Sequence, residues 1–157
     1  MENSSGMRPH VSRKVPCRTQ VAKMVLSLDK VIPSDLSLLD DAVAEITTAI
    51  DRTACCEDAE SIGLAVREAL VNAIVHGNHC ELQKAVRVSV AVCDNGDLLI
   101  VVKDSGSGFD PSKLPDPTAA KNLLGDHGRG IFLMKRLMDE VDFKFDHGTE
   151  VGMRRKR

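Results

Sequence analysis

The sequence predicts an α/β (α+β) two-layer sandwich, in which helices cover one face of a mixed, mostly antiparallel sheet. Two observations lead to this fold class. Segments with strand and helix periodicity follow one another in the order β-α-α-β-β-loop-α-β-β. The composition is 43% apolar, with four Phe and no Trp or Tyr, so the core between the layers must be aliphatic. We expect residues 1–19 to be a mobile leader and residues 20–157 to form a single domain.

In the first part of the chain, the apolar pattern predicts one strand and two helices. Residues 21–33 are typical of a strand that ends at Pro33. Apolar residues at helical spacing predict one helix over residues 36–50 and a second over residues 57–76. Gly77 follows the second helix, and we expect it to be the C′ glycine that ends it.

The second part predicts a hairpin, a long loop, a helix and a closing hairpin. Valines alternate with other residues over 86–92, and the turn sequence Asp94-Asn95-Gly96-Asp97 leads into a strand over 98–103. Residues 110–127 are rich in Pro and lack periodicity, and a loop of this length inside a compact domain is usually functional or mobile. The remaining expected elements are a helix over residues 128–141 and strands over residues 141–146 and 149–155.

Composition excludes several classes of protein. The net charge of −2 creates no field that favours nucleic acid or a membrane, and the scarcity of aromatics argues against binding of single-stranded nucleic acid. The basic residues at both ends are either solvated or contact an acidic partner or nucleic acid. Five cysteines without a CxxC pair indicate a reducing cytoplasm rather than a secreted disulfide framework. No signal peptide or membrane span is recognisable.

The helix predicted over residues 57–76 carries a polar stripe. Glu68, Asn72 and His76 are four residues apart and lie beside its apolar side, at the lip of a pocket. An amide oxygen such as that of Asn72, together with phosphate oxygens, satisfies Mg²⁺. Glu68, one turn earlier, is placed to accept a proton from a hydroxyl or to orient a water. The alternative is that both residues simply face solvent.

Asp104 follows a strand that is expected to be buried, where a carboxylate without a partner is costly. One interpretation is that it accepts the exocyclic amine of adenine. The other is an Asx-turn to the backbone of Ser105 or Gly106. We expect Gly106 and Gly108 to adopt positive φ and to let the backbone approach a nucleotide closely.

A glycine-studded segment precedes the last predicted helix. Gly128, Arg129 and Gly130 lie where this helix is expected to begin, and free N–H groups at such an end bind anions. Their backbone amides are therefore expected to hold phosphates. Arg129 either adds a charged contact or faces solvent, and Lys121 and Asn122 in the preceding loop are possible closing contacts.

These motifs, in the order E…N, DxGxG, GxG and the closing Gly148-Thr149, resemble the Bergerat (GHKL) ATP-binding fold of histidine-kinase-like ATPases over about residues 20–155. Within that superfamily the chain is similar to the anti-sigma-factor serine/threonine kinases of bacterial partner-switching systems. The resemblance implies ATP and Mg²⁺ as cofactors, Glu68 as catalytic base and Asn72 as metal ligand. It implies nucleotide contacts from Asn72, Asp104, Gly106, Gly108, Gly128, Arg129, Gly130 and Thr149.

The resemblance also implies partners and an activity. Such a protein binds a sigma factor in one state and phosphorylates a serine of a STAS-domain antagonist in another, as a cytoplasmic homodimer without direct contact to nucleic acid or membrane. One position departs from the family pattern, because phosphorylating members carry an arginine ahead of the glycine pair, where this chain has Asp126. The arginine here lies inside the glycines, as Arg129, so either Arg129 substitutes for it or the γ-phosphate is handled less well. In the second case the chain is a nucleotide-responsive binding module that sequesters its partner without phosphotransfer. A third interpretation, the ATPase half of a sensor histidine kinase, is disfavoured because we see no dimerisation hairpin with a phospho-accepting His.

Overall fold

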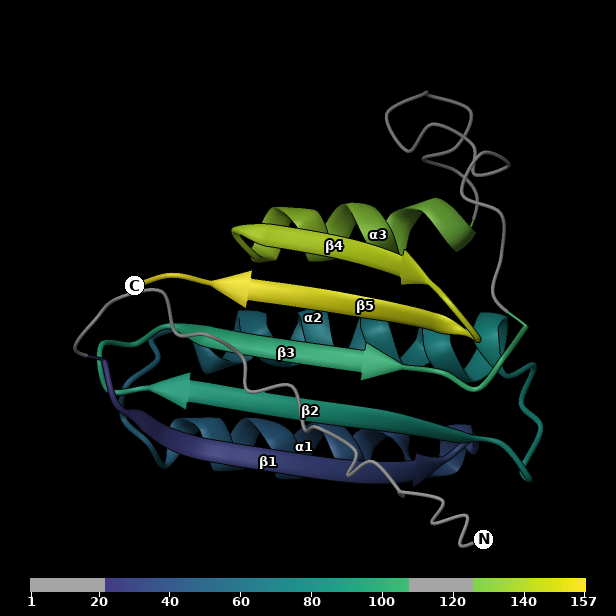
Figure 1. Cartoon of the computed structure of the whole chain (residues 1–157), viewed down its shortest axis with the longest axis horizontal. Helices are drawn as coiled ribbons and strands as arrows, with labels where there is room; N and C mark the ends of the chain where they lie inside the picture. The colour runs from purple at the N-terminus through teal and green to yellow at the C-terminus, as the bar shows by residue number, and fades with distance from the viewer. Residues whose placement is uncertain (1–21, 108–125) are drawn as a thin grey trace, which may run out of the picture.

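The computed structural model describes residues 22–107 and 126–157. Within them, five strands form one sheet in the order β1-β2-β3-β5-β4, and every neighbouring pair is antiparallel. The helices lie on one face of this sheet (Figure 1), which confirms the expected two-layer α/β sandwich. The strands are β1 (Met24–Pro33), β2 (Ala85–Cys93), β3 (Leu98–Lys103), β4 (Glu140–Phe145) and β5 (Thr149–Arg155).

In the described residues, three α-helices form the second layer. They are α1 (Leu39–Asp51), α2 (Ala59–Val71) and α3 (Asp126–Leu137). The helix expected from residue 36 begins with a 3₁₀ turn, Leu36–Leu38, because the Asp35 carboxylate accepts a hydrogen bond from the Ser37 N–H at 2.8 Å and caps it. Helix α2 contacts both α1 and α3, so it is the central helix of the layer.

The core between the layers is aliphatic, as the composition predicts. Its largest fully buried side chains come from all three helices and from the central strands. The residues concerned are Ile46, Ile50, Ile62, Leu70, Ile74, Ile100, Met134 and Met153.

The helix expected over residues 57–76 changes character at Asn72. Helix α2 ends at Val71 and continues as a π-helix, η2 (Asn72–Gly77), in which the Asn78 N–H donates to the Ala73 carbonyl at 2.8 Å. The prediction that Gly77 is a C′ glycine was wrong, because its φ is not positive. Short π-helical turns of this kind are rare and occur frequently at functional sites.

Four of the five cysteines lie in the described residues. Cys55, Cys56 and Cys80 are free thiols, and Cys93 is disulfide-bonded. Burial raises the pKa of the Cys56 thiol. In the part of the chain that the structure describes, no helix has the length and apolar character needed to cross a membrane.

Candidate active site

The carboxylate of Asp104 lies at the end of β3 and is almost completely buried, with 4% of the residue exposed. Its Oδ1 atom accepts two backbone hydrogen bonds, from the Gly106 N–H at 2.9 Å and from the Thr149 N–H at 3.0 Å. Its own N–H donates to the Thr149 carbonyl at 3.0 Å. No group of the described residues donates to Oδ2. The Asx-turn is therefore present, yet it occupies only one of the two oxygens.

Three glycines from three segments surround this carboxylate. A Cβ atom built on Gly77 would overlap Asp104 Oδ2, one on Gly106 would overlap the Gly77 carbonyl, and one on Gly148 would overlap the Asp104 backbone carbonyl. Gly148 also has a φ of +109°. The expected positive φ of Gly106 was wrong, because glycine is required there by the close approach of Gly77. We call Gly77, Gly106 and Gly148 the glycine collar.

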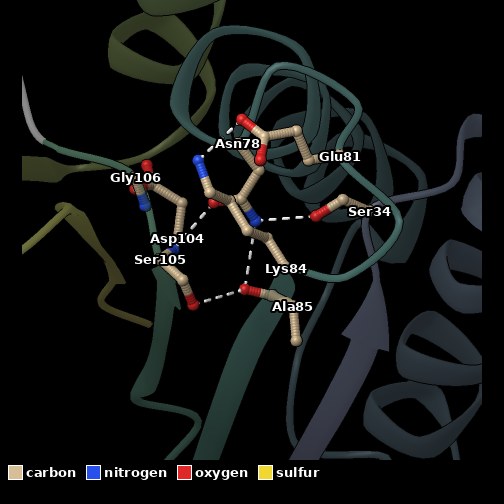
Figure 2. A network of polar contacts seen from close by, with 8 residues as sticks. All are labelled: Ser34, Asn78, Glu81, Lys84, Ala85, Asp104, Ser105 and Gly106. Atoms are coloured by element: carbon tan, nitrogen blue, oxygen red, sulfur yellow. Dashed lines mark hydrogen bonds and ion pairs between the residues drawn. The ribbon is translucent and has the colours of Figure 1, made fainter.

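A buried amide next to the collar was not singled out from the sequence. Asn78 has no exposed surface, and its side chain joins three segments (Figure 2). Its Nδ2 donates to Ser34 Oγ at 2.7 Å and to the Ala85 carbonyl at 3.1 Å, and its Oδ1 accepts the Ser105 N–H at 2.8 Å. At the rim of this network, the hydrogen bond from Lys84 holds the pKa of the Glu81 carboxyl below its usual value.

The second part of the candidate site lies between α2 and α3. Glu68 and Asn72 are half-buried and one helical turn apart. A Cβ atom on Gly130 would lie 2.7 Å from Glu68 Oε2 and 3.7 Å from both terminal atoms of the Asn72 amide. The glycine thus allows α3 to approach both side chains. Neither side chain forms a hydrogen bond or ion pair with any described residue.

The remaining predicted site residues occupy these same elements or lie outside the described residues. Thr149 is buried, at 8% exposure, and opens β5 opposite Asp104. Gly128 is the third residue of α3, and Arg129 is exposed on the same helix. Gly108, Lys121, Asn122 and the leader over residues 1–19 lie outside the described residues. Asp104 and Thr149 thus form one end of the site, and Glu68, Asn72 and Gly130 form another.

The order of elements, the aliphatic core and the two polar groups define a domain of the histidine-kinase-like ATPase class. Residues 32–155 match the profile of the histidine kinase-like ATPase domain. The chain therefore belongs to the histidine kinase-like ATPase domain family, and the resemblance drawn from its motifs is confirmed.

Two curated proteins and one solved structure are similar to this chain. The chain is 34% identical over 104 residues to the anti-sigma F factor of Clostridium perfringens, covering 64% of this chain and 74% of that protein. It is 34% identical over 103 residues to the serine-protein kinase RsbW of Bacillus velezensis, covering 62% of this chain and 64% of that protein. The histidine kinase domain of a blue-light activated histidine kinase from Erythrobacter litoralis superposes with a TM-score of 0.47 at 22% identity, covering 75% of this chain and 60% of that one.

Proposed function

We propose that this chain is an anti-sigma regulatory factor with ATP-dependent serine/threonine protein kinase activity. It would bind a sigma factor and phosphorylate a STAS-domain antagonist, as a homodimer in the cytoplasm. The names of its relatives support the regulatory part of this proposal. The observation that carries the nucleotide part is the buried Asp104 carboxylate, which offers one oxygen without a donor among the described residues.

Asp104 is proposed to read the base of ATP. A carboxylate buried to this extent is costly unless it is hydrogen-bonded. The backbone N–H groups of Gly106 and Thr149 orient Oδ1, which leaves Oδ2 to accept the exocyclic amine of adenine. Such a charge-assisted hydrogen bond is stronger than one between neutral groups. Thr149 is proposed to contact the edge of the same base.

The phosphates are proposed to lie between α3 and the loop after β3. Gly128, Arg129 and Gly130 lie among the first five residues of α3. The N-terminal end of a helix attracts anions through its backbone N–H groups and the positive end of the helix dipole. Gly106 would complete the backbone lining on the side of the loop after β3, and Gly108, which lies outside the described residues, is proposed as a further contact from its place in the sequence.

Asn72 is proposed to hold Mg²⁺ through its amide oxygen. The residues present fit this metal, since the amide is half-buried, makes no hydrogen bond within the described residues and offers a hard oxygen. When bound, Mg²⁺ supplies positive charge that neutralises the phosphates.

Glu68 is proposed to be the catalytic base. In the transfer, the seryl oxygen of the antagonist forms a bond to the γ-phosphorus, and the bond from that phosphorus to the ADP oxygen breaks. The proton of the seryl hydroxyl passes to the Glu68 carboxylate. A half-buried carboxylate without a partner in the described residues is available for this role.

Phosphotransfer with labelled ATP tests the proposal. Purified protein with Mg²⁺ should label a cognate STAS-domain protein, and Asn72→Ala should abolish labelling while its circular dichroism remains that of the wild type. Glu68→Gln should retain nucleotide binding and lose transfer. Undiminished transfer by Asn72→Ala would contradict the metal assignment.

A second candidate is a nucleotide-responsive binding module without phosphotransfer. Asp126, the first residue of α3, favours it, because the related kinases carry an arginine ahead of the glycine pair. Tight ATP binding without any phosphorylated product, for every STAS-domain partner tried, would favour this second function.

A further inference from the structure

We propose that Asn78 is a positioning residue for adenine recognition, which holds the loop that follows Asp104 in the geometry that reads the base. The proposal rests on the proposed function, since it assumes that Asp104 accepts the adenine amine. Asn78 would thus contribute to specificity for the base without contacting the nucleotide. It is not one of the residues of the E…N, DxGxG, GxG and Gly148-Thr149 motifs.

The first support is the complete use of the hydrogen-bonding groups of Asn78 (Figure 2). Its side-chain nitrogen donates to Ser34 Oγ and the Ala85 carbonyl, and its side-chain oxygen accepts the Ser105 N–H. Ser34 is also fully buried. A buried amide with every group paired fixes its partners strongly, because loss of any one bond leaves a buried polar group unpaired.

The hydrogen bonds of Asn78 act on Ser105, the residue that follows Asp104. Ser105 is exposed, yet it is held at two atoms: its N–H by Asn78 Oδ1, and its Oγ by the Ala85 carbonyl at 2.9 Å. Ser105 lies between Asp104 and Gly106, whose N–H orients the carboxylate. Fixing Ser105 therefore fixes the Asx-turn, and the Asx-turn fixes the direction of Oδ2.

The third support is the requirement for an amide. The site needs two donors toward Ser34 and Ala85 and one acceptor toward Ser105, and a carboxamide supplies both kinds of group. The backbone N–H of Asn78 also closes the π-helical turn at Ala73. The same residue thus joins η2, which begins with Asn72, to the loop after Asp104.

Base discrimination provides the test. Calorimetry would measure the affinities of the full chain for ADP and for inosine diphosphate, which carries a carbonyl oxygen where adenine carries its amine. We expect wild type to prefer ADP, and Asn78→Leu to lose about tenfold or more of that preference by weakening ADP alone. Ser34→Ala is the matched control. It leaves one donor of the buried Asn78 amide unpaired and should lower stability, but it keeps the bond to Ser105, so its preference for ADP should stay within about twofold of wild type.

The affinities of wild type test base reading by Asp104, and the comparison of wild type with Asn78→Leu tests positioning by Asn78. If wild type binds neither nucleotide, or binds both equally, base reading by Asp104 is wrong and the inference falls with it. If wild type prefers ADP and Asn78→Leu keeps the same ratio, the inference alone is wrong.

Amide exchange in the wild type decides the matter if Asn78→Leu does not fold. The Ser105 N–H should exchange slowly despite the exposure of Ser105, because Asn78 holds it. Ser107 is also exposed and its N–H has no acceptor among the described residues, so its exchange is the internal reference. Equal exchange at Ser105 and Ser107 would contradict the proposal.

Discussion

The two ends of the candidate site are built in different ways. Around Asp104, backbone groups from β5, from η2 and from the loop after β3 enclose one carboxylate, and the glycine collar leaves no room for a side chain. Between α2 and α3, Glu68 and Asn72 are half-buried and have no hydrogen-bond partner among the described residues. The first end is fixed before a ligand arrives, whereas the second has side chains ready to be ordered by one. Substitutions at the first end should therefore act on binding, and substitutions at the second on turnover.

The largest effect is expected at the glycine collar. Gly106→Ala should reduce ADP binding below detection, because its Cβ would overlap the Gly77 carbonyl and neither backbone can move without displacing Asp104. Gly152→Ala in β5 is the matched control, since its Cβ would meet only the Asp142 carbonyl at 4.0 Å. Calorimetry on both variants checks the prediction. Wild-type affinity in Gly106→Ala would show that the collar is not rigid.

A core substitution separates binding from stability. Ile46 in α1 is fully buried and belongs to neither end of the site, so Ile46→Ala should lower the free energy of unfolding by about 2–5 kcal/mol. The affinity for ADP should not change under folding conditions. Urea denaturation and calorimetry measure the two quantities. A parallel fall in affinity would mean that the Asp104 end depends on general stability and not on its own contacts.

At the other end, Gly130→Ala should impair turnover more than binding. Its Cβ would lie 2.7 Å from Glu68 Oε2, so the carboxylate or α3 must shift by several tenths of an ångström. A displaced catalytic group lowers the rate by about 10- to 100-fold. The phosphotransfer rate and the affinity for ADP should be measured on the same protein. Equal losses in both would contradict the division between the two ends.

The smallest effect concerns the rim of the Asn78 network. The Lys84 hydrogen bond lowers the pKa of Glu81, so this pair stabilises the fold above the ordinary pKa of a Glu and loses that effect as pH falls through the lowered value. Lys84→Ala should return the pKa of Glu81 upward to its ordinary range and leave ADP binding unchanged. An NMR titration of the Glu81 side chain measures the shift. An unchanged pKa would assign the lowering to another group.

The order of the elements could be predicted from the sequence because periodicity is local. Strand β2, for example, was expected over residues 86–92 and spans Ala85–Cys93. The π-helix could not be predicted, since it depends on the Asn78 N–H reaching Ala73 in the folded chain.

Those parts of the candidate site that depend on local sequence patterns could also be predicted. Glu68 and Asn72 follow from helical spacing, and Asp104 from its place after a strand. The contacts that set Asp104 are long-range, because Asn78 and Ser105 are 27 positions apart in the sequence and Asp104 and Thr149 are 45 positions apart. The reason for glycine at Gly77 and Gly106 is likewise a close approach between distant segments, which no local pattern encodes.

The most direct test of the central claim is calorimetric titration with ATP and ADP, with and without Mg²⁺, on wild type and Asp104→Asn. In the variant, an amide would still accept from Gly106 and Thr149 but would present a donor where the adenine amine needs an acceptor. We expect wild type to bind both nucleotides, with Mg²⁺ increasing the affinity, and Asp104→Asn to bind about 10- to 100-fold more weakly. Absence of nucleotide binding by wild type, or equal binding by Asp104→Asn, would contradict the account.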